Sequence, residues 1–309
     1  MIEVQNLTKR YGGTLAVDDL SFTVRPGLVT GFLGPNGAGK STTMRAILGL
    51  DRPTSGQVLV GGHSYADLPA PITAVGALLD AKAIDKGRSA RNHLRALAAT
   101  AGIGAGRVDE VLALVGLTSV ARRPAGHFSL GMGQRLGIAA ALLGDPEVVV
   151  LDEPTNGLDP DGILWIRTLV RDLAAEGRTV LVSSHLMSEM ELTADHLVVI
   201  GQGRLVADEP MHRILAGATA THVSVRTPQR TQLVELLSRP DVTITRRGTD
   251  GLDVTGVDAS VIGGIASVAG VELHELHTVS ASLEDAYMEL TRTAVGYRGT
   301  TTTVEGPLS

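Results

Sequence analysis

Apolar and polar residues alternate at the start of the chain, from Ile2 to Leu7, which is the pattern of a half-buried strand. Turns rich in glycine and proline separate further apolar runs, which we predict to be strands at 21–25, 28–33 and 57–60. A helix rich in Ala and Leu is expected from Lys40 to about Leu50. The N-terminal region is therefore predicted to be mainly β-structure, with a glycine-rich loop at 34–39 leading into a helix.

The pattern changes between about 81 and 143, where Ala and Leu recur at helical spacing in 92–100, 107–115 and 134–143. We interpret this stretch as a helical subdomain inserted into an α/β core. Strands resume at 147–151 and 179–182 as continuous β-branched runs, which are typical of parallel strands covered on both faces. Helices at about 161–175 and 187–193 alternate with them, and a hairpin of 196–200 and 204–207 closes the region.

A second pattern begins near residue 220. Its predicted order is strand 222–226, helix 229–237, strands 242–246 and 252–255, helix 259–268 and strand 271–276, followed by a last helix at 283–293. This β-α-β-β-α-β order is that of ferredoxin-like domains. We therefore expect one domain at 1–217, a small α+β accessory domain at 220–295, and a disordered tail at 296–309.

Composition excludes several classes of function. The 309 residues carry 27 Lys and Arg against 33 Asp and Glu, so the net charge of −6 gives no general attraction for nucleic acid. Without cysteine the chain has no disulfide, thiolate metal site or cysteine nucleophile. Its longest apolar runs fall far short of the roughly 20 residues that span a bilayer. Any path across a membrane must come from another chain.

The glycine-rich loop carries the strongest single motif. Its residues match the pattern G-x-x-x-x-G-K-[ST] and are Gly34, Pro35, Asn36, Gly37, Ala38, Gly39, Lys40 and Ser41. In such a loop the backbone N–H groups surround phosphate oxygens, the lysine faces the β- and γ-phosphates, and the hydroxyl binds Mg²⁺. We assign Thr42, the next residue, to the same site. The alternative is an accidental match among 37 glycines, which the strand before and the helix after the loop disfavour.

The apolar run 148–151 ends in two acids, Asp152 and Glu153. In phosphate-loop enzymes an aspartate at this point holds Mg²⁺, and the next acid can polarise a water that attacks the γ-phosphate. An acidic strand end is ordinary on its own. Its combination with the phosphate loop makes it a candidate site for ATP hydrolysis.

Together with three further motifs, these features resemble the nucleotide-binding subunits of ABC transporters over about residues 1–215. Residues 128–135 resemble the ABC signature, 156–160 resemble the D-loop, and 183–185 resemble the switch-histidine segment. The resemblance implies an α/β P-loop NTPase fold of the ABC type, with ATP and Mg²⁺ as cofactors. It also implies that Tyr11 stacks on adenine and that Asp152 organises the magnesium shell.

The same resemblance implies a dimer in which two copies face each other head to tail. Ser129 and Gly131 of one copy would contact the γ-phosphate held by Lys40 of the other. Glu153 would be the general base, and His185 would hold or sense the γ-phosphate. The remaining residues that the resemblance assigns to nucleotide contact are Gln134 and Asp159.

Two positions depart from the family pattern. Asp80 stands where the family has a glutamine after the strand 74–79, and its carboxylate could still reach Mg²⁺ or a water. Leu130 replaces the first glycine of the signature. Neither change removes a catalytic group, so we expect an active ATPase.

The helix that begins Ser282-Leu283-Glu284 resembles the ending of the drug and antibiotic exporter group, with the daunorubicin- and bacitracin-resistance ATPases as the nearest comparison. This implies an exporter subunit at the cytoplasmic face of the membrane, energising a separate polytopic permease, with no nucleic-acid partner. One alternative is a soluble ABC ATPase acting on ribosomes or nucleic acid, and another is a module that sequesters a toxic compound. For the C-terminal domain we favour a stabilising or dimer-supporting role over a small-molecule site, and the transported substrate stays open.

Overall fold

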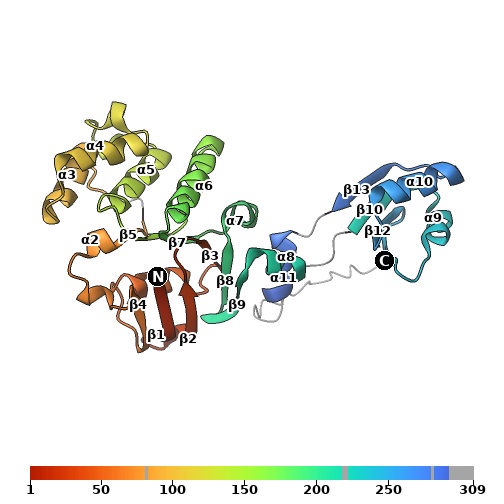
Figure 1. Cartoon of the computed structure of the whole chain (residues 1–309), viewed down its shortest axis with the longest axis horizontal. Coiled ribbons are helices and arrows are strands. Elements are labelled where there is room, and N and C mark those ends of the chain that lie inside the picture. Colours follow the sequence, from red (N-terminus) through yellow and green to blue (C-terminus); the bar gives the residue numbers. More distant parts are fainter. Residues whose placement is uncertain (81–82, 218–221, 280–281, 292–309) are drawn as a thin grey trace, which may run out of the picture. The chain divides into compact units, whose positions relative to one another are not determined.

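The computed structural model describes residues 1–80, 83–217, 222–279 and 282–291 (Figure 1). The chain divides into two compact units, one built from Met1–Met211 and one from His212–Glu289. Each unit has its own apolar core. The tail predicted at 296–309 lies outside the described residues.

Two sheets form the first unit. A three-stranded antiparallel sheet has the order β2 (Thr14–Val24), β1 (Ile2–Tyr11), β4 (Ser55–Val60). A six-stranded sheet has the order β5 (Val75–Leu78), β6 (Val148–Leu151), β7 (Thr179–Ser183), β3 (Val29–Leu33), β8 (His196–Gly201), β9 (Arg204–Pro210). All neighbours in the larger sheet are parallel except β9, which returns antiparallel to β8 as the predicted hairpin. Because β3, β6 and β7 are parallel, the segments that follow them meet at one edge of the sheet.

Among the described residues, the stretch predicted to be helical, about 81–143, contains three of the helices. They are α3 (Ala90–Thr100), α4 (Ala105–Leu114) and α5 (Leu130–Ala141), which pack on one another beside the β5 edge of the sheet (Figure 1). Ser89 and Ser129 cap α3 and α5, each accepting a backbone N–H bond three residues on. The other helices of this unit are α1 (Lys40–Ile47), α2 (Pro71–Ala74), α6 (Pro160–Ala175) and α7 (Met187–Thr193).

The second unit contains a four-stranded sheet in which every pairing is antiparallel. Its strand order is β11 (Thr243–Arg247), β12 (Gly251–Thr255), β10 (His222–Arg226), β13 (Glu275–Val279). The helices assigned to it are α8 (Met211–Gly217), α9 (Arg230–Leu237), α10 (Ala259–Ala269) and α11 (Leu283–Thr291). Both α9 and α10 bury apolar residues in the core that the sheet forms.

Several element boundaries differ from the predictions. The last strand was predicted at 271–276 and instead begins at Glu275, because Val271 is buried in the core as part of the loop after α10 rather than as a strand residue. The first strand was predicted to end at Leu7 and continues to Tyr11, because pairing with β2 persists through irregular register. The short helices α2 and α8 were not predicted.

In the described part of the chain, no helix is both long enough and apolar enough to cross a membrane.

Candidate functional site

The phosphate loop lies between β3 and α1, as the sequence predicts, and its shape depends on two glycines. Gly37 and Gly39 have φ of +80° and +103°, in the region that favours glycine. A Cβ added at Gly39 would lie 2.6 Å from the carbonyl oxygen of Ala16. The Ala38 carbonyl accepts a hydrogen bond of 3.0 Å from the Gly203 N–H. The loop is thus held between β2 and the β8–β9 turn, in a conformation that side chains at these glycines would block.

Lys40 begins α1 and is largely buried. Its Nζ donates to the carbonyl oxygens of Gly34, at 2.5 Å, and Pro35, at 3.3 Å. Burial lowers the pKa of Lys40, and the nearby carboxylates of Glu153 and Asp152 oppose that shift. A largely buried ammonium in a glycine-rich loop at the start of a helix is a site for a polyanion.

Nucleotide binding at alkaline pH is expected to take up protons. The pKa of Lys40 is lowered in the free protein, and a bound triphosphate would raise it again. The pKa of Lys40 is lower in the folded protein than in the unfolded chain. As pH rises through the folded pKa, the folded protein loses this proton first, so its free energy of unfolding increases. The increase ends when the lysine of the unfolded chain also loses its proton. Calorimetric titration in two buffers of different ionisation enthalpy would measure the uptake. Proton release at alkaline pH would contradict this account.

Ser41 and Asp152 come from separate elements and meet beside the phosphate loop. The Ser41 hydroxyl donates to Asp152 Oδ2 at 2.9 Å, although 111 positions separate the two residues. A hydroxyl and a carboxylate are the oxygen ligands that Mg²⁺ accepts, usually with waters and substrate phosphates completing the shell. The described residues hold no cluster of three or more His, Cys, Asp or Glu that could bind a metal ion. These side chains therefore fit ATP with Mg²⁺.

Glu153 and His185 form the second part of the site. His185 Nδ1 lies 2.7 Å from Glu153 Oε2, and the Glu153 backbone adopts a φ of +50°, which is uncommon for a residue other than glycine. Gln134 of α5 donates from Nε2 to the Glu153 carbonyl oxygen at 3.2 Å. The Glu153 carboxylate is about one-fifth exposed. It can therefore meet a water while its backbone is held in place.

Ser183 connects the two acids, a role that its place in the switch-histidine segment did not predict. It is fully buried at the end of β7. Its hydroxyl donates to Asp152 Oδ1 and accepts from the Glu153 N–H at 2.9 Å. In the sequence, Ser183 is the first residue of the switch-histidine segment, and nothing there shows that its side chain contacts the two acids. Ser183 sets the orientation of one acid relative to the other.

Tyr11 is held by a contact that the sequence does not reveal. Its hydroxyl donates to Asp51 at 2.6 Å, and the same carboxylate accepts from Arg45 Nε at 2.7 Å. Hydrogen bonding to Asp51 raises the pKa of Tyr11. Lys9 Nζ lies 4.9 Å from the ring centroid. The ring is nearly half exposed and anchored, as a stacking platform for a base requires.

The signature and the D-loop lie against each other within one chain. Leu130 is half exposed, and one of its methyl groups occupies the space that a Cβ on Gly157 would need. Ser129 caps α5, and Asp159 caps α6 by accepting from the Gly162 N–H at 2.9 Å. The structure thus places Ser129, Gly131 and Asp159 near one another. A substituent on Gly131 would meet the Gly157 carbonyl oxygen at 3.1 Å.

Asp80 follows β5, whose neighbour β6 leads to Asp152 and Glu153. The Asp152 N–H donates to the Leu78 carbonyl oxygen at 2.7 Å, so the ends of these strands are tied together. The backbone carbonyl of Asp80 accepts from the Ala83 N–H at 3.2 Å. Asp80 therefore lies at the same sheet edge as the other predicted site residues.

The fold and site define a phosphate-loop ATPase with an inserted helical segment. Residues 17–156 match the family described as ABC transporter, and residues 221–284 match one described as a domain of unknown function. The chain is 36% identical to an ABC transporter ATP-binding protein, YhcH of Bacillus subtilis, over 94% of this chain and 96% of that one. The chain belongs to the ABC transporter family as an ATP-binding subunit, an ATPase whose hydrolysis is coupled to transport.

Other relatives agree with this assignment. The bacitracin transport ATP-binding protein BcrA of Bacillus licheniformis is 43% identical over 69% of this chain and 71% of its own length. The daunorubicin resistance ATP-binding protein DrrA3 of Streptomyces coeruleorubidus is 33% identical over 94% and 95%. A dimeric structure of the bacterial ABC transporter cassette MJ0796 matches with a TM-score of 0.64 and 25% identity, over 68% of this chain and 99% of that one. None of these relatives supports action on ribosomes or nucleic acid.

Proposed function

We propose that this protein is the ATP-hydrolysing subunit of an exporter for a drug, an antibiotic or another amphiphile. Its place would be the cytoplasmic face of the membrane, peripheral to a separate permease. The observation that carries the proposal is the joined group of Ser41, Asp152, Glu153 and His185 on one sheet edge. The printed functions of the bacitracin and daunorubicin relatives support export and antibiotic resistance in particular.

Each site residue has a separate role in the proposed reaction. Lys40 and the N–H groups of the loop bind the phosphates, while Ser41, Asp152 and Asp80 would hold Mg²⁺. The cation supplies charge neutralisation at the phosphates. Glu153 orients a water and accepts its proton at the carboxylate. His185 keeps that carboxylate in place and faces the γ-phosphate. The remaining nucleotide contacts that we propose are Tyr11, Gly34, Pro35, Asn36, Gly37, Ala38, Gly39 and Thr42.

A second copy of the chain would complete each site. Ser129, Gly131 and Asp159 would act on nucleotide held by the phosphate loop of the partner copy, in a head-to-tail dimer with two equal sites. Gln134, predicted to contact nucleotide, is buried and donates to the Glu153 carbonyl oxygen of its own chain, so we assign it to holding Glu153 instead. The exposed position of Leu130 beside the D-loop supports such a contact. The dimeric MJ0796 cassette gives it a precedent.

The permease would dock in a hollow of about 700 Å³ in the first unit. The hollow is lined by the partly buried apolar residues Tyr65 and Ile72 and by residues of the helical segment such as Leu97. Its lining suits a short amphipathic helix from another protein. Motion of the helical segment would then be transmitted to the permease helix that occupies the hollow.

We further propose that residues 1–217 form the ATPase domain and that 220–295 form a ferredoxin-like accessory domain. The order β11–β12–β10–β13 supports this class, because it places the first and third strands of the unit at the centre of an antiparallel sheet. A supporting role in the dimer is favoured over ligand binding.

The test is a pull-down from solubilised membranes with the Glu153→Gln variant loaded with ATP. We expect a protein with several membrane-spanning helices to be recovered in an ATP-dependent manner. The same variant without nucleotide is the control. Recovery of ribosomes or nucleic acid, or of nothing, would leave the ATPase assignment in place and remove the exporter proposal.

A further inference from the structure

The connection between α5 and β6, residues 142–146, joins two parts of the proposed machinery. At its N-terminal side is α5, which begins beside Ser129 and Gly131 of the signature. At its C-terminal side is β6, which leads to Asp152 and Glu153. In the dimer proposed above these two ends serve different ATP molecules. The geometry of this connection therefore sets where the signature residues of one ATP site lie relative to the two acids of the other.

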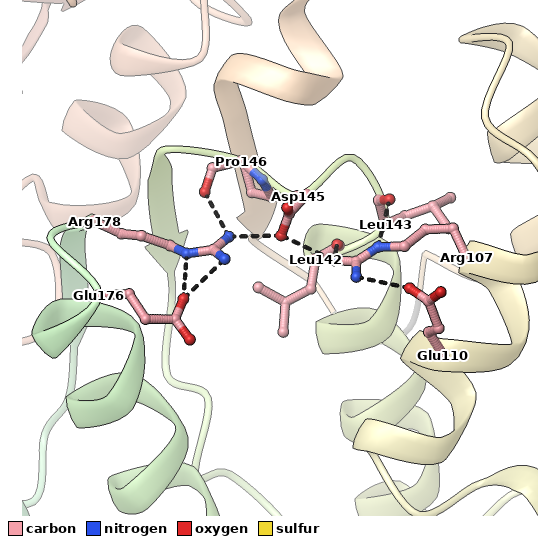
Figure 2. Close-up of polar contacts among 8 residues, drawn as sticks. All are labelled: Arg107, Glu110, Leu142, Leu143, Asp145, Pro146, Glu176 and Arg178. Carbon is pink, nitrogen blue, oxygen red and sulfur yellow. Dashed lines mark hydrogen bonds and ion pairs between the residues drawn. The ribbon is translucent and has the colours of Figure 1, made fainter.

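Asp145 is the centre of a polar network at this connection (Figure 2). One of its carboxylate oxygens, Oδ1, accepts from Arg107 Nη2 at 3.1 Å and from Arg178 Nη1 at 3.0 Å. Arg107 belongs to α4 of the helical segment, and Arg178 immediately precedes β7 of the catalytic sheet. The carboxylate thus bridges two subdomains as well as two arginines.

The two arginines also hold the backbone on either side of Asp145. Arg107 donates to the carbonyl oxygens of Leu142, at 2.9 Å, and Leu143, at 3.4 Å, which lie at the C-terminal end of α5. A cation at that end satisfies free carbonyls and complements the helix dipole. Arg178 donates to the Pro146 carbonyl oxygen at 3.1 Å (Figure 2). The whole turn from helix to strand is therefore clamped.

Close backbone packing fixes the same end of α5 from another side. A Cβ at Gly76 of β5 would collide with the carbonyl oxygen of Ala141, the last residue of α5. A Cβ at Gly144 would collide with the carbonyl oxygen of Ile72. There is no space for the C-terminal end of α5 to shift towards β5. Its N-terminal end lies about 18 Å away along a 12-residue helix, so a small change of angle here moves Ser129 considerably.

The exposure of these side chains argues for a positional role over a large stabilising one. The Asp145 side chain is 62% exposed, and pairs of this kind contribute little to global stability. The backbone of Asp145 has a φ of +53°, a conformation that aspartate and asparagine tolerate better than other side chains. A contact that sets the angle between α5 and β6 needs only to favour one value of that angle over slightly different ones.

We propose that Asp145 is a positioning residue for ATP hydrolysis. By bridging Arg107 and Arg178, it sets the angle between α5 and β6, and so places Ser129 and Gly131 over the ATP that a second copy holds. The inference rests on the dimeric mechanism proposed above. Its prediction is specific: loss of the bridge leaves each copy able to bind ATP and impairs closure of the dimer.

The experiment places Asp145→Asn and Asp145→Ala in the full-length chain, alone and combined with Glu153→Gln. Asparagine keeps the backbone preference and the size and removes the charge, which guards against simple failure to fold. Asp109→Ala is the matched control, since it removes a similarly exposed carboxylate that pairs with Arg91 inside the helical segment. ATP affinity of the monomer, the ATP-dependent dimer fraction, and KM and kcat are measured for each variant.

For Asp145→Ala we expect monomer ATP affinity within about twofold of the parent, and a loss of about ten- to a hundredfold in kcat and in dimer formation, because displacements near 1 Å carry penalties of this size. For Asp145→Asn, we expect kcat and the dimer fraction to lie between those of Asp145→Ala and those of the parent. Equal dimer formation by Asp145→Ala and Asp109→Ala would overturn the inference. A loss of monomer ATP affinity as large as the loss of dimer formation would also overturn it.

If Glu153→Gln alone fails to dimerise with ATP, the proposed function fails together with the inference. If it dimerises and the Asp145 variants do so equally well, only the inference fails.

Discussion

Replacing Glu153 by Gln is expected to lower ATP turnover by about 10²–10⁴-fold, the usual cost of removing a positioned general base. The amide keeps the size of the side chain and one acceptor towards His185, and it cannot take the proton of the attacking water. The backbone of residue 153, held by Ser183 and Gln134, should not change. ATP should therefore still bind, and the dimer should accumulate in its closed state. Phosphate release and size-exclusion chromatography measure the two effects.

The matched control is Glu189→Gln on α7. This change also removes one carboxylate charge, from a side chain that pairs with Arg167 at 2.8 Å. We expect its turnover to stay within about threefold of the parent, since loss of a partly exposed ion pair costs little. If Glu153→Gln retained more than about a tenth of the parent turnover, the assignment of Glu153 as the base would be wrong, because the expected loss is at least 10²-fold.

Replacing Lys40 by Ala is expected to weaken ATP binding by about 10²–10³-fold. Removing one member of a buried charge pair typically costs about 2–5 kcal/mol, and each 1.4 kcal/mol is a factor of ten. Lys40 is the buried cation of the phosphate loop, and its loss also leaves the Gly34 and Pro35 carbonyl oxygens without their donor. The effect should be larger for ATP than for adenosine, which has no phosphate. Equilibrium titration with both ligands measures the difference.

Lys86→Ala provides the control for charge alone, because it removes a lysine from an exposed position. Its ATP affinity should remain close to that of the parent. If Lys40→Ala bound ATP as tightly as Lys86→Ala, the loop at 34–41 would not be the phosphate-binding site.

The elements that the sequence predicts well are those whose signal is local. The phosphate loop is one contiguous motif, and the apolar runs that became β6 and β7 are long enough to identify buried parallel strands. The spacing of Ala and Leu likewise located α3, α4 and α5 within a few residues. The error at the last strand has the same origin. Val271 is apolar because it is buried, and burial alone does not distinguish a strand from a loop.

Within the site, residues carried by a motif were identified, and residues that support them were not. Asp51 stands outside the motifs, and Ser183 lies in the switch-histidine segment with no predicted role. Yet Ser183 holds Asp152 with Glu153, and Asp51 holds Tyr11 with Arg45. The contacts of Ser183 with both acids and of Asp51 with Tyr11 join residues 30 or more positions apart, which no local pattern encodes. The fit of Leu130 against Gly157 explains in the same way why a departure from the signature pattern leaves the loop well packed.

The sequence by itself determined the order of the strands and longer helices, the phosphate loop, the two acids and the family to which the chain belongs. It could do so because hydrophobic periodicity and contiguous motifs are properties of neighbouring residues. Only the tertiary structure decided which side chains meet: Ser41 with Asp152, Ser183 with both acids, and Asp145 with Arg107 and Arg178. These contacts arise when parallel strands bring distant segments to one sheet edge and when helix ends pack against them, so their energies depend on the whole fold.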